Sequence, residues 1–268
     1  MYRIAAVFIC LLVLTMGGVA FSSEGKAPEL EIAVHEFCPY LCDSTKENGK
    51  HGYVVDLLRA IYEPAFSLRF YRVPYVRGIL QTETGRFDGM PMLNSSSSEK
   101  VILSREPIGI LVQNFYVKKG VNWKYQGVQS LKGIVIGSIL GYNYSPLSPE
   151  YETYQRNHRE TGWVEYVGGV DATLINMRKI LAGRITTFNE CADLVDFIGM
   201  KEGIAHKFQS AGTLGIAKNY MGFSPKRADA KALADLFDKR IVQLRQSGEL
   251  SRILAPYGVT DWVKKKPQ

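Results

Sequence analysis

The chain has 268 residues, of which 46% are hydrophobic and 22% charged, and its formal net charge is +7. This is ordinary globular composition, which excludes a fibrous chain and a largely disordered one. The lysines and arginines are scattered, apart from the run Lys264-Lys265-Lys266 at the end, so the charge favours solubility and a mild attraction for anionic solutes over nucleic-acid binding.

The first 22 residues have the layout of a secretory signal peptide. Arg3 gives a short positive start, the stretch 4–14 is almost entirely apolar, and small residues follow up to Ala20-Phe21-Ser22. A membrane anchor is the alternative, but a span needs roughly 20 apolar residues and this run is shorter. We therefore expect cleavage after about residue 22 and export to the periplasm.

Three cysteines remain after cleavage: Cys38, Cys42 and Cys191. An odd number in an oxidising compartment leaves at least one thiol unpaired. Cys38 and Cys42 lie four residues apart in a loop, which favours a local disulfide with Cys191 reduced. A metal-binding pair is the alternative, but no second ligand pair with suitable spacing accompanies it, so we expect no metal and no cofactor.

Strands and helices alternate over the first hundred mature residues. The hydrophobic patterns predict strands at 30–37, 68–73 and 87–93 and helices at 54–66 and 75–82. Strand, helix, strand is the order typical of an open α/β sheet with crossover helices.

The same order starts again after Gly120. The patterns predict a helical turn at 130–132, strands at 133–139, 163–167 and 185–188, and helices at 172–181, 228–248 and 249–255. We expect one lobe from residues 23–117 and 216–268 and a second lobe from 118–215. Extended segments near 117–119 and 213–216 would be the two hinge strands.

Catalytic signatures are absent from the sequence. It contains no nucleophile elbow, no phosphate-binding loop and no His-Glu-x-x-His motif. The four histidines, His35, His51, His158 and His206, are dispersed, and we interpret each as a surface or structural residue.

Four short motifs, in this order and spacing, carry a family resemblance. They are Gly52-Tyr53-Val54-Val55-Asp56-Leu57-Leu58, Gly85-Arg86-Phe87-Asp88-Gly89, Ser130-Leu131-Lys132-Gly133 and Leu244-Arg245-Gln246-Ser247-Gly248-Glu249-Leu250. On these motifs the chain resembles a divergent member of the bacterial extracellular solute-binding proteins of family 3, which include periplasmic polar amino-acid receptors of ABC transporters. The resemblance implies a two-lobed α/β fold of the type II periplasmic-binding-protein class, a monomer with two hinge strands, and a small-molecule ligand between the lobes. It also implies an ABC-transporter permease as partner.

The ligand-binding motifs of that family are not preserved. Its amino-acid receptors carry Thr-x-x-Arg after the third strand, where the arginine holds the ligand carboxylate, but Ser97 stands at that position here. Lys100 cannot offer the bidentate fork of an arginine. The aspartate that holds the ligand amine is also missing, and Glu190 or Cys191 stands nearest to its place.

Other residues could bind the ligand instead. Arg77 lies in Pro74-Tyr75-Val76-Arg77, a segment that faces the cleft in divergent members of the family; a surface arginine is the alternative. If a helix began near Tyr142, its free N–H groups would form an anion site, whereas core packing of these tyrosines is the alternative. The expected ligand-binding residues are Phe37, Tyr40, Tyr75, Arg77, Asn94, Ser95, Tyr142, Asn143, Tyr144 and Glu190.

Three functions are therefore open. The first is a solute-binding protein for a small polar ligand, anionic or amino-acid-like. The second is a dehydratase-like enzyme on the same scaffold, with Glu190 as its acid or base and Asp88 as a weaker candidate. The third is a soluble sensory module that would act through a membrane partner.

Overall fold

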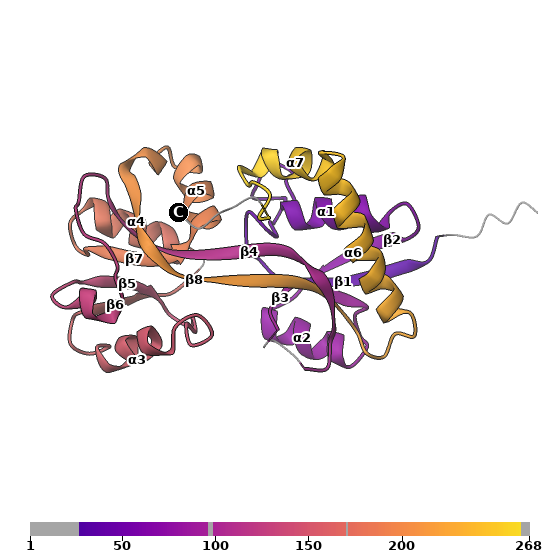
Figure 1. Ribbon diagram of the computed structural model, residues 1–268, viewed down its shortest axis with the longest axis horizontal. Coiled ribbons are helices and arrows are strands. Elements are labelled where there is room, and N and C mark those ends of the chain that lie inside the picture. Colours follow the sequence, from indigo (N-terminus) through magenta and orange to yellow (C-terminus); the bar gives the residue numbers. More distant parts are fainter. Residues whose placement is uncertain (1–26, 96–98, 170, 264–268) are drawn as a thin grey trace, which may run out of the picture.

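The computed structural model describes residues 27–95, 99–169 and 171–263. The expected signal peptide, residues 1–22, and Ser97 lie outside the described residues. Within these ranges no helix is both long and apolar enough to span a bilayer. The chain forms two α/β lobes joined by two long strands, β4 (Ile102–Lys118) and β8 (Phe208–Phe223), as Figure 1 shows.

The first lobe combines the start of the chain with its end. Its elements are β1 (Glu29–Val34), α1 (Tyr53–Tyr62), β2 (Ser67–Arg72), α2 (Tyr75–Glu83), β3 (Gly89–Leu93), α6 (Ala230–Gln246), α7 (Glu249–Leu254) and the 3-10 helix η3 (Ala255–Tyr257). Helix α1 forms because Val54, Leu57, Leu58 and Ile61 recur at helical spacing and are all buried. It ends at Tyr62, four residues earlier than the pattern predicts, just before Pro64.

The second lobe lies between the two long strands in sequence. Its elements are η1 (Val128–Leu131), β5 (Ile136–Ile139), α3 (Pro149–Asn157), β6 (Val164–Val167), α4 (Ala172–Leu181), β7 (Thr187–Cys191), α5 (Ala192–Lys201) and η2 (Ala205–Lys207). Helices α3 and α5 are additions to the elements predicted from the sequence. Each lobe has apolar clusters on both faces of its strands, for example Phe115 and Tyr151 on the α3 side and Tyr116 and Phe188 on the α4 side.

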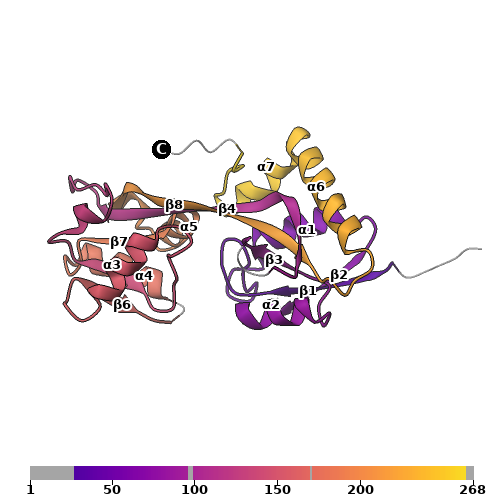
Figure 2. The same ribbon diagram turned by 60° about the horizontal axis from the view of Figure 1, so that its bottom comes forward.

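One eight-stranded sheet runs through the described residues of both lobes, in the order β2-β1-β3-β8-β4-β7-β5-β6. Strand β3 is antiparallel to β8, and β7 is antiparallel to β4. Since β4 leads into the second lobe and β8 leads back, the carboxyl ends of β3 and β7 point toward the opposite lobe. Strands β1 and β2 are parallel to β3, and β5 and β6 are parallel to β7. The carboxyl ends of both sets of parallel strands therefore point toward each other between the two lobes, which β4 and β8 connect (Figure 2).

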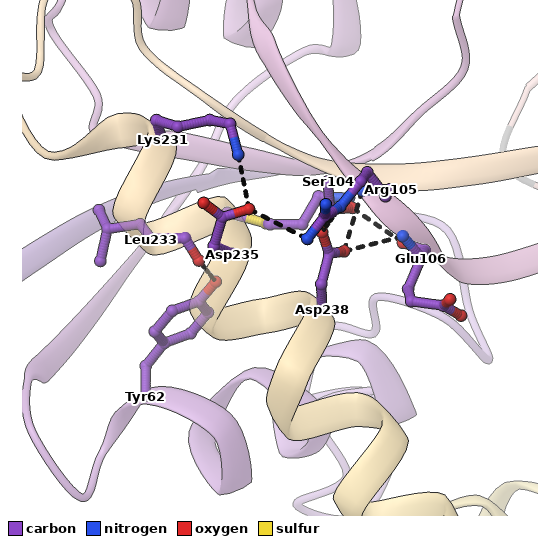
Figure 3. Close-up of polar contacts among 9 residues, drawn as sticks. Tyr62, Ser104, Arg105, Glu106, Lys231, Leu233, Asp235 and Asp238 are labelled. Atoms are coloured by element: carbon purple, nitrogen blue, oxygen red, sulfur yellow. Dashed lines mark hydrogen bonds and ion pairs between the residues drawn. The ribbon is translucent and has the colours of Figure 1, made fainter.

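A buried carboxylate anchors the start of β4 to helix α6 (Figure 3). Asp238 is 7% exposed, and its Oδ1 accepts hydrogen bonds from the backbone N–H groups of Arg105 (2.9 Å) and Glu106 (2.8 Å). Its Oδ2 accepts from the Arg105 Nε at 2.9 Å. Next to Pro107 the pairing of β4 with β8 is irregular, so Asp238 supplies the acceptors that a regular ladder would otherwise provide.

The two crossings are long strands, as a two-lobed chain requires. Segment 117–119 lies at the far end of β4, where Val117 and Lys118 pair with Gln209 and Phe208. Residues Gln113 to Tyr116 already pair with β7 of the second lobe. The exact lobe boundaries at 117/118 and 215/216 stay a prediction.

Candidate functional site

Most of the expected ligand-binding residues follow the carboxyl ends of parallel strands. The first lobe contributes Phe37 after β1, Tyr75 and Arg77 after β2, and Asn94 and Ser95 after β3; the second contributes Tyr142, Asn143 and Tyr144 after β5 and Glu190 at the end of β7. These residues therefore lie at or near the two facing edges, and their contact with a ligand stays a prediction. Ligand sites of open α/β sheets lie at such strand ends.

A row of aromatic rings lines the edge of the first lobe. His35 lies 4.9 Å from the Tyr75 ring and 5.8 Å from the Phe37 ring, and Phe37 stacks on Tyr40 at 4.8 Å. A hollow of about 460 Å³ adjoins this row, with His35 and Tyr75 in its wall. The rings offer an apolar surface against which a ligand could pack.

His35 is a neutral imidazole in this setting. Burial, together with the charge of Arg72, lowers the pKa of His35 to about 4. Its Nδ1 is buried and has no hydrogen-bond partner among the described residues. A neutral ring with a free nitrogen can donate to or accept from a ligand, depending on its tautomer.

Arg77 is exposed and makes no hydrogen bond or ion pair with the described residues. It occupies the first turn of α2, directly after β2. Arg72, at the end of β2, is instead committed to the Glu36 carboxylate at 2.6 Å and the Cys42 carbonyl at 2.7 Å. Of these two arginines at the edge of the first lobe, Arg77 has its guanidinium available for an anion.

Tyr40 has a different place from the one expected. It is fully buried, and its hydroxyl donates to Asp193 Oδ2 at 3.0 Å and lies 3.0 Å from Cys191 Sγ. Burial and the neighbouring Cys191 and Asp193 raise the pKa of Tyr40. Asp193 begins α5 of the second lobe, so we assign Tyr40 to the junction between the lobes rather than to ligand contact.

The turn after β5 does not begin a helix, so the expected helix N-terminus is not there. Helix α3 starts only at Pro149, capped by Ser148, whose hydroxyl accepts from the Tyr151 N–H at 3.2 Å. Instead, the Tyr144 N–H of this turn donates to the carboxylate of Glu152 in helix α3 at 2.9 Å. Tyr144 itself is 2% exposed and packs in the core, as the core-packing alternative has it, whereas Tyr142 is 38% exposed.

The Asn143 side chain is used within the same turn. Its Oδ1 accepts from the Ser145 N–H at 3.0 Å, which closes a local turn. Of the three residues expected here, Tyr144 is buried and Asn143 is engaged within the turn, whereas Tyr142 is exposed.

Glu190 is fully buried at the end of β7. Its carboxylate accepts from the Thr173 hydroxyl at 2.6 Å and from the Cys191 N–H at 2.7 Å. Burial outweighs these two hydrogen bonds and raises the pKa of Glu190 to about 7. This carboxyl group is therefore poised to change charge near neutral pH.

Three polar residues close to these strand ends were not among the expected ligand-binding residues: His35, Gln113 and Asn189. Gln113 Oε1 and both amide atoms of Asn189 are buried without a hydrogen-bond partner among the described residues. Gln113 lies opposite Cys191 in the β4–β7 ladder, and Asn189 lies one residue before Glu190. Of the three, His35 lies nearest to a residue named from the sequence, since it directly follows β1 and Phe37 comes two residues later.

The structure tests the prediction made for the cysteines. Cys38 and Cys42 form the predicted disulfide, and Cys191 is a free, buried thiol. Across residues 27–95, 99–169 and 171–263, no group of three or more His, Cys, Asp or Glu side chains is placed to hold a metal ion.

Comparisons with known proteins identify the fold. No family model and no curated protein matches the sequence. The probable amino-acid ABC transporter extracellular-binding protein of Bacillus subtilis superposes with a TM-score of 0.67 at 18% identity, over 87% of this chain and 98% of its own. Substrate-binding domain 2 of Lactococcus lactis GlnP in its open conformation gives 0.62 at 18% identity, over 87% and 96% of the two chains.

A third similar structure is a histidine kinase sensor domain with similarity to periplasmic binding proteins. It gives a TM-score of 0.61 at 18% identity, over 87% of this chain and 96% of its own. The chain thus has the two-lobed fold of periplasmic binding proteins, as its sequence motifs predict.

Proposed function

We propose that this protein is an exported solute-binding protein. It captures a small polar, anionic or amino-acid-like molecule between its lobes in the periplasm, acts as a monomer, and delivers the ligand to an ABC-transporter permease. The single observation that carries the proposal is that the carboxyl ends of two sets of parallel strands face each other across two crossing strands. The structures similar to this one by fold include an amino-acid transporter binding protein, which supports the same function.

The side chains at the site suggest how the ligand is held. Arg77 offers a guanidinium fork for a carboxylate or a similar anion. The aromatic row with Phe37 and Tyr75 covers the ligand body, and neutral His35 adds one hydrogen bond. Glu190, when ionised, faces a ligand amine from the second lobe. Asn94 and Ser95 complete the first-lobe edge where the family arginine is missing.

The test is calorimetry on Arg77 variants, with the compound that mass spectrometry identifies in the native protein. Removing a charge-assisted fork from a closed cleft should weaken binding by about 2–4 kcal/mol, or on the order of 30- to 1,000-fold. Arg77→Lys keeps the charge but loses the fork, so it should recover only part of the loss. Binding by a folded Arg77→Ala protein within about twofold of the parent would show that Arg77 is only a surface residue.

A sensory role is the second candidate, because a histidine kinase sensor domain shares the fold. Crosslinking of the ligand-loaded protein in its native envelope separates the two roles. A transporter permease as the captured partner supports delivery, and a membrane signalling protein supports sensing. An enzyme would instead convert the bound compound, with activity lost in Glu190→Gln.

A further inference from the structure

A second cavity lies beside the crossing strands and contains none of the expected ligand-binding residues. Its volume is about 390 Å³, enough for a small organic molecule. We call it the hinge cavity. The residues that matter for its chemistry are Asn114, Tyr116, Asp193, Asp196, Phe208 and Trp262.

The hinge cavity is built from both lobes. Thr260 and Trp262 come from the C-terminal segment of the first lobe, whereas Asp193 and Asp196 lie one helical turn apart on α5 of the second. Asn114 of β4 also lines it. The residues of β4 that line the cavity are Ile110, Val112, Asn114 and Tyr116, every second residue of the strand, and Gln113 is not among them. The cavity and Gln113 therefore lie on different sides of the crossing strand.

Two carboxylates and three aromatic rings meet in this cavity. The three rings belong to Tyr116, Phe208 and Trp262, which are 6%, 9% and 4% exposed. A cation near such ring faces gains a cation–π attraction, and carboxylates add charge-assisted hydrogen bonds. An anion would be repelled by Asp193 and Asp196.

We propose that the hinge cavity binds a small organic cation, namely a primary amine with an apolar body. The ammonium group lies against Asp193 and Asp196, and the apolar body packs on Tyr116 and Trp262. Asp193 also accepts the hydrogen bond from Tyr40 at 3.0 Å, so the bound amine shares a partner with the junction between the lobes. This site is independent of the ligand proposed for the interlobe cleft.

The test is calorimetric titration of the mature protein with benzylamine, with benzyl alcohol as its uncharged counterpart. We expect one benzylamine per chain and at least tenfold weaker binding of benzyl alcohol. Asp196→Asn should weaken benzylamine at least tenfold, and Asp193→Asn should do the same. Glu160→Gln, which removes an exposed carboxylate elsewhere on the second lobe, should leave the affinity unchanged. Equal binding of the two compounds, or parent-like affinity in both aspartate variants, would overturn the proposal.

A further variant locates the bound amine. Benzylamine should quench or shift Trp262 fluorescence, and this signal should vanish in Trp262→Phe. The last control is a variant that ends at Val263. If this variant binds benzylamine and the intact protein does not, the cavity does not bind a free amine in the intact protein and the proposal is overturned.

Discussion

The buried Glu190 should contribute stability that is lost as the pH rises toward neutrality. Its pKa is about 7 in the folded protein, against a usual value of 4.5. Between these two pH values the folded state holds a proton that the unfolded state has released. The stabilisation is therefore fully present below pH 4.5 and is lost as the pH rises through 7. A shift of this size corresponds to about 3 kcal/mol across the window.

Glu190→Gln removes this titration while keeping an oxygen that can accept from Thr173 and Cys191. Urea unfolding of both proteins from pH 4.5 to 8 measures the effect. We expect the difference in unfolding free energy between parent and variant to change by about 3 kcal/mol over this range. His35, whose pKa is lowered, changes stability in the opposite direction, but it is present in both proteins and cancels in the difference. If the difference in unfolding free energy stays constant from pH 4.5 to 8, the raised pKa of the buried Glu190 carboxyl is refuted.

Three other predictions test the framework of the lobes. Asp238→Ala should destabilise the protein by about 3–5 kcal/mol in urea unfolding, because two backbone N–H groups and Arg105 lose their acceptor. Asp235→Ala, at a half-buried residue that also pairs with Arg105, should cost less than about 1 kcal/mol, and equal losses would contradict the anchoring role. Tyr40→Phe should cost about 1–3 kcal/mol because Asp193 loses a donor, and an unchanged urea midpoint would dismiss this link. Small-angle scattering should show a smaller radius of gyration with saturating ligand, and an identical profile would count against closure.

Local signals carried much of the fold prediction. The helical spacing of apolar residues gave α1 and α4, and the four-residue spacing of Cys38 and Cys42 gave the disulfide. Helix α3 also had a signal that was overlooked: Ser148 as a capping residue followed by Pro149 and Glu150 in the first turn. Helix α5 had none, since it begins directly after β7 without a capping side chain or a loop.

The site could be predicted only in outline. The α/β pattern predicts a site at the strand ends, which makes Phe37, Tyr75 and Arg77 candidates, and their contact with a ligand stays a prediction. The burial of Tyr40 and its bond to Asp193 depend on residues 153 positions apart, which no local pattern encodes. The same holds for Gln113 and Asn189, whose unpartnered amides become visible only once β4 and β7 pair.

Native mass spectrometry of the protein isolated from its own host tests the central claim most directly. The account predicts one small polar molecule bound per monomer, released unchanged on unfolding and rebound by the refolded protein, with binding weakened in Arg77→Ala. A monomer that carries no small molecule and binds none of the polar metabolites of the host extract would contradict it. So would a released compound that the protein has chemically converted.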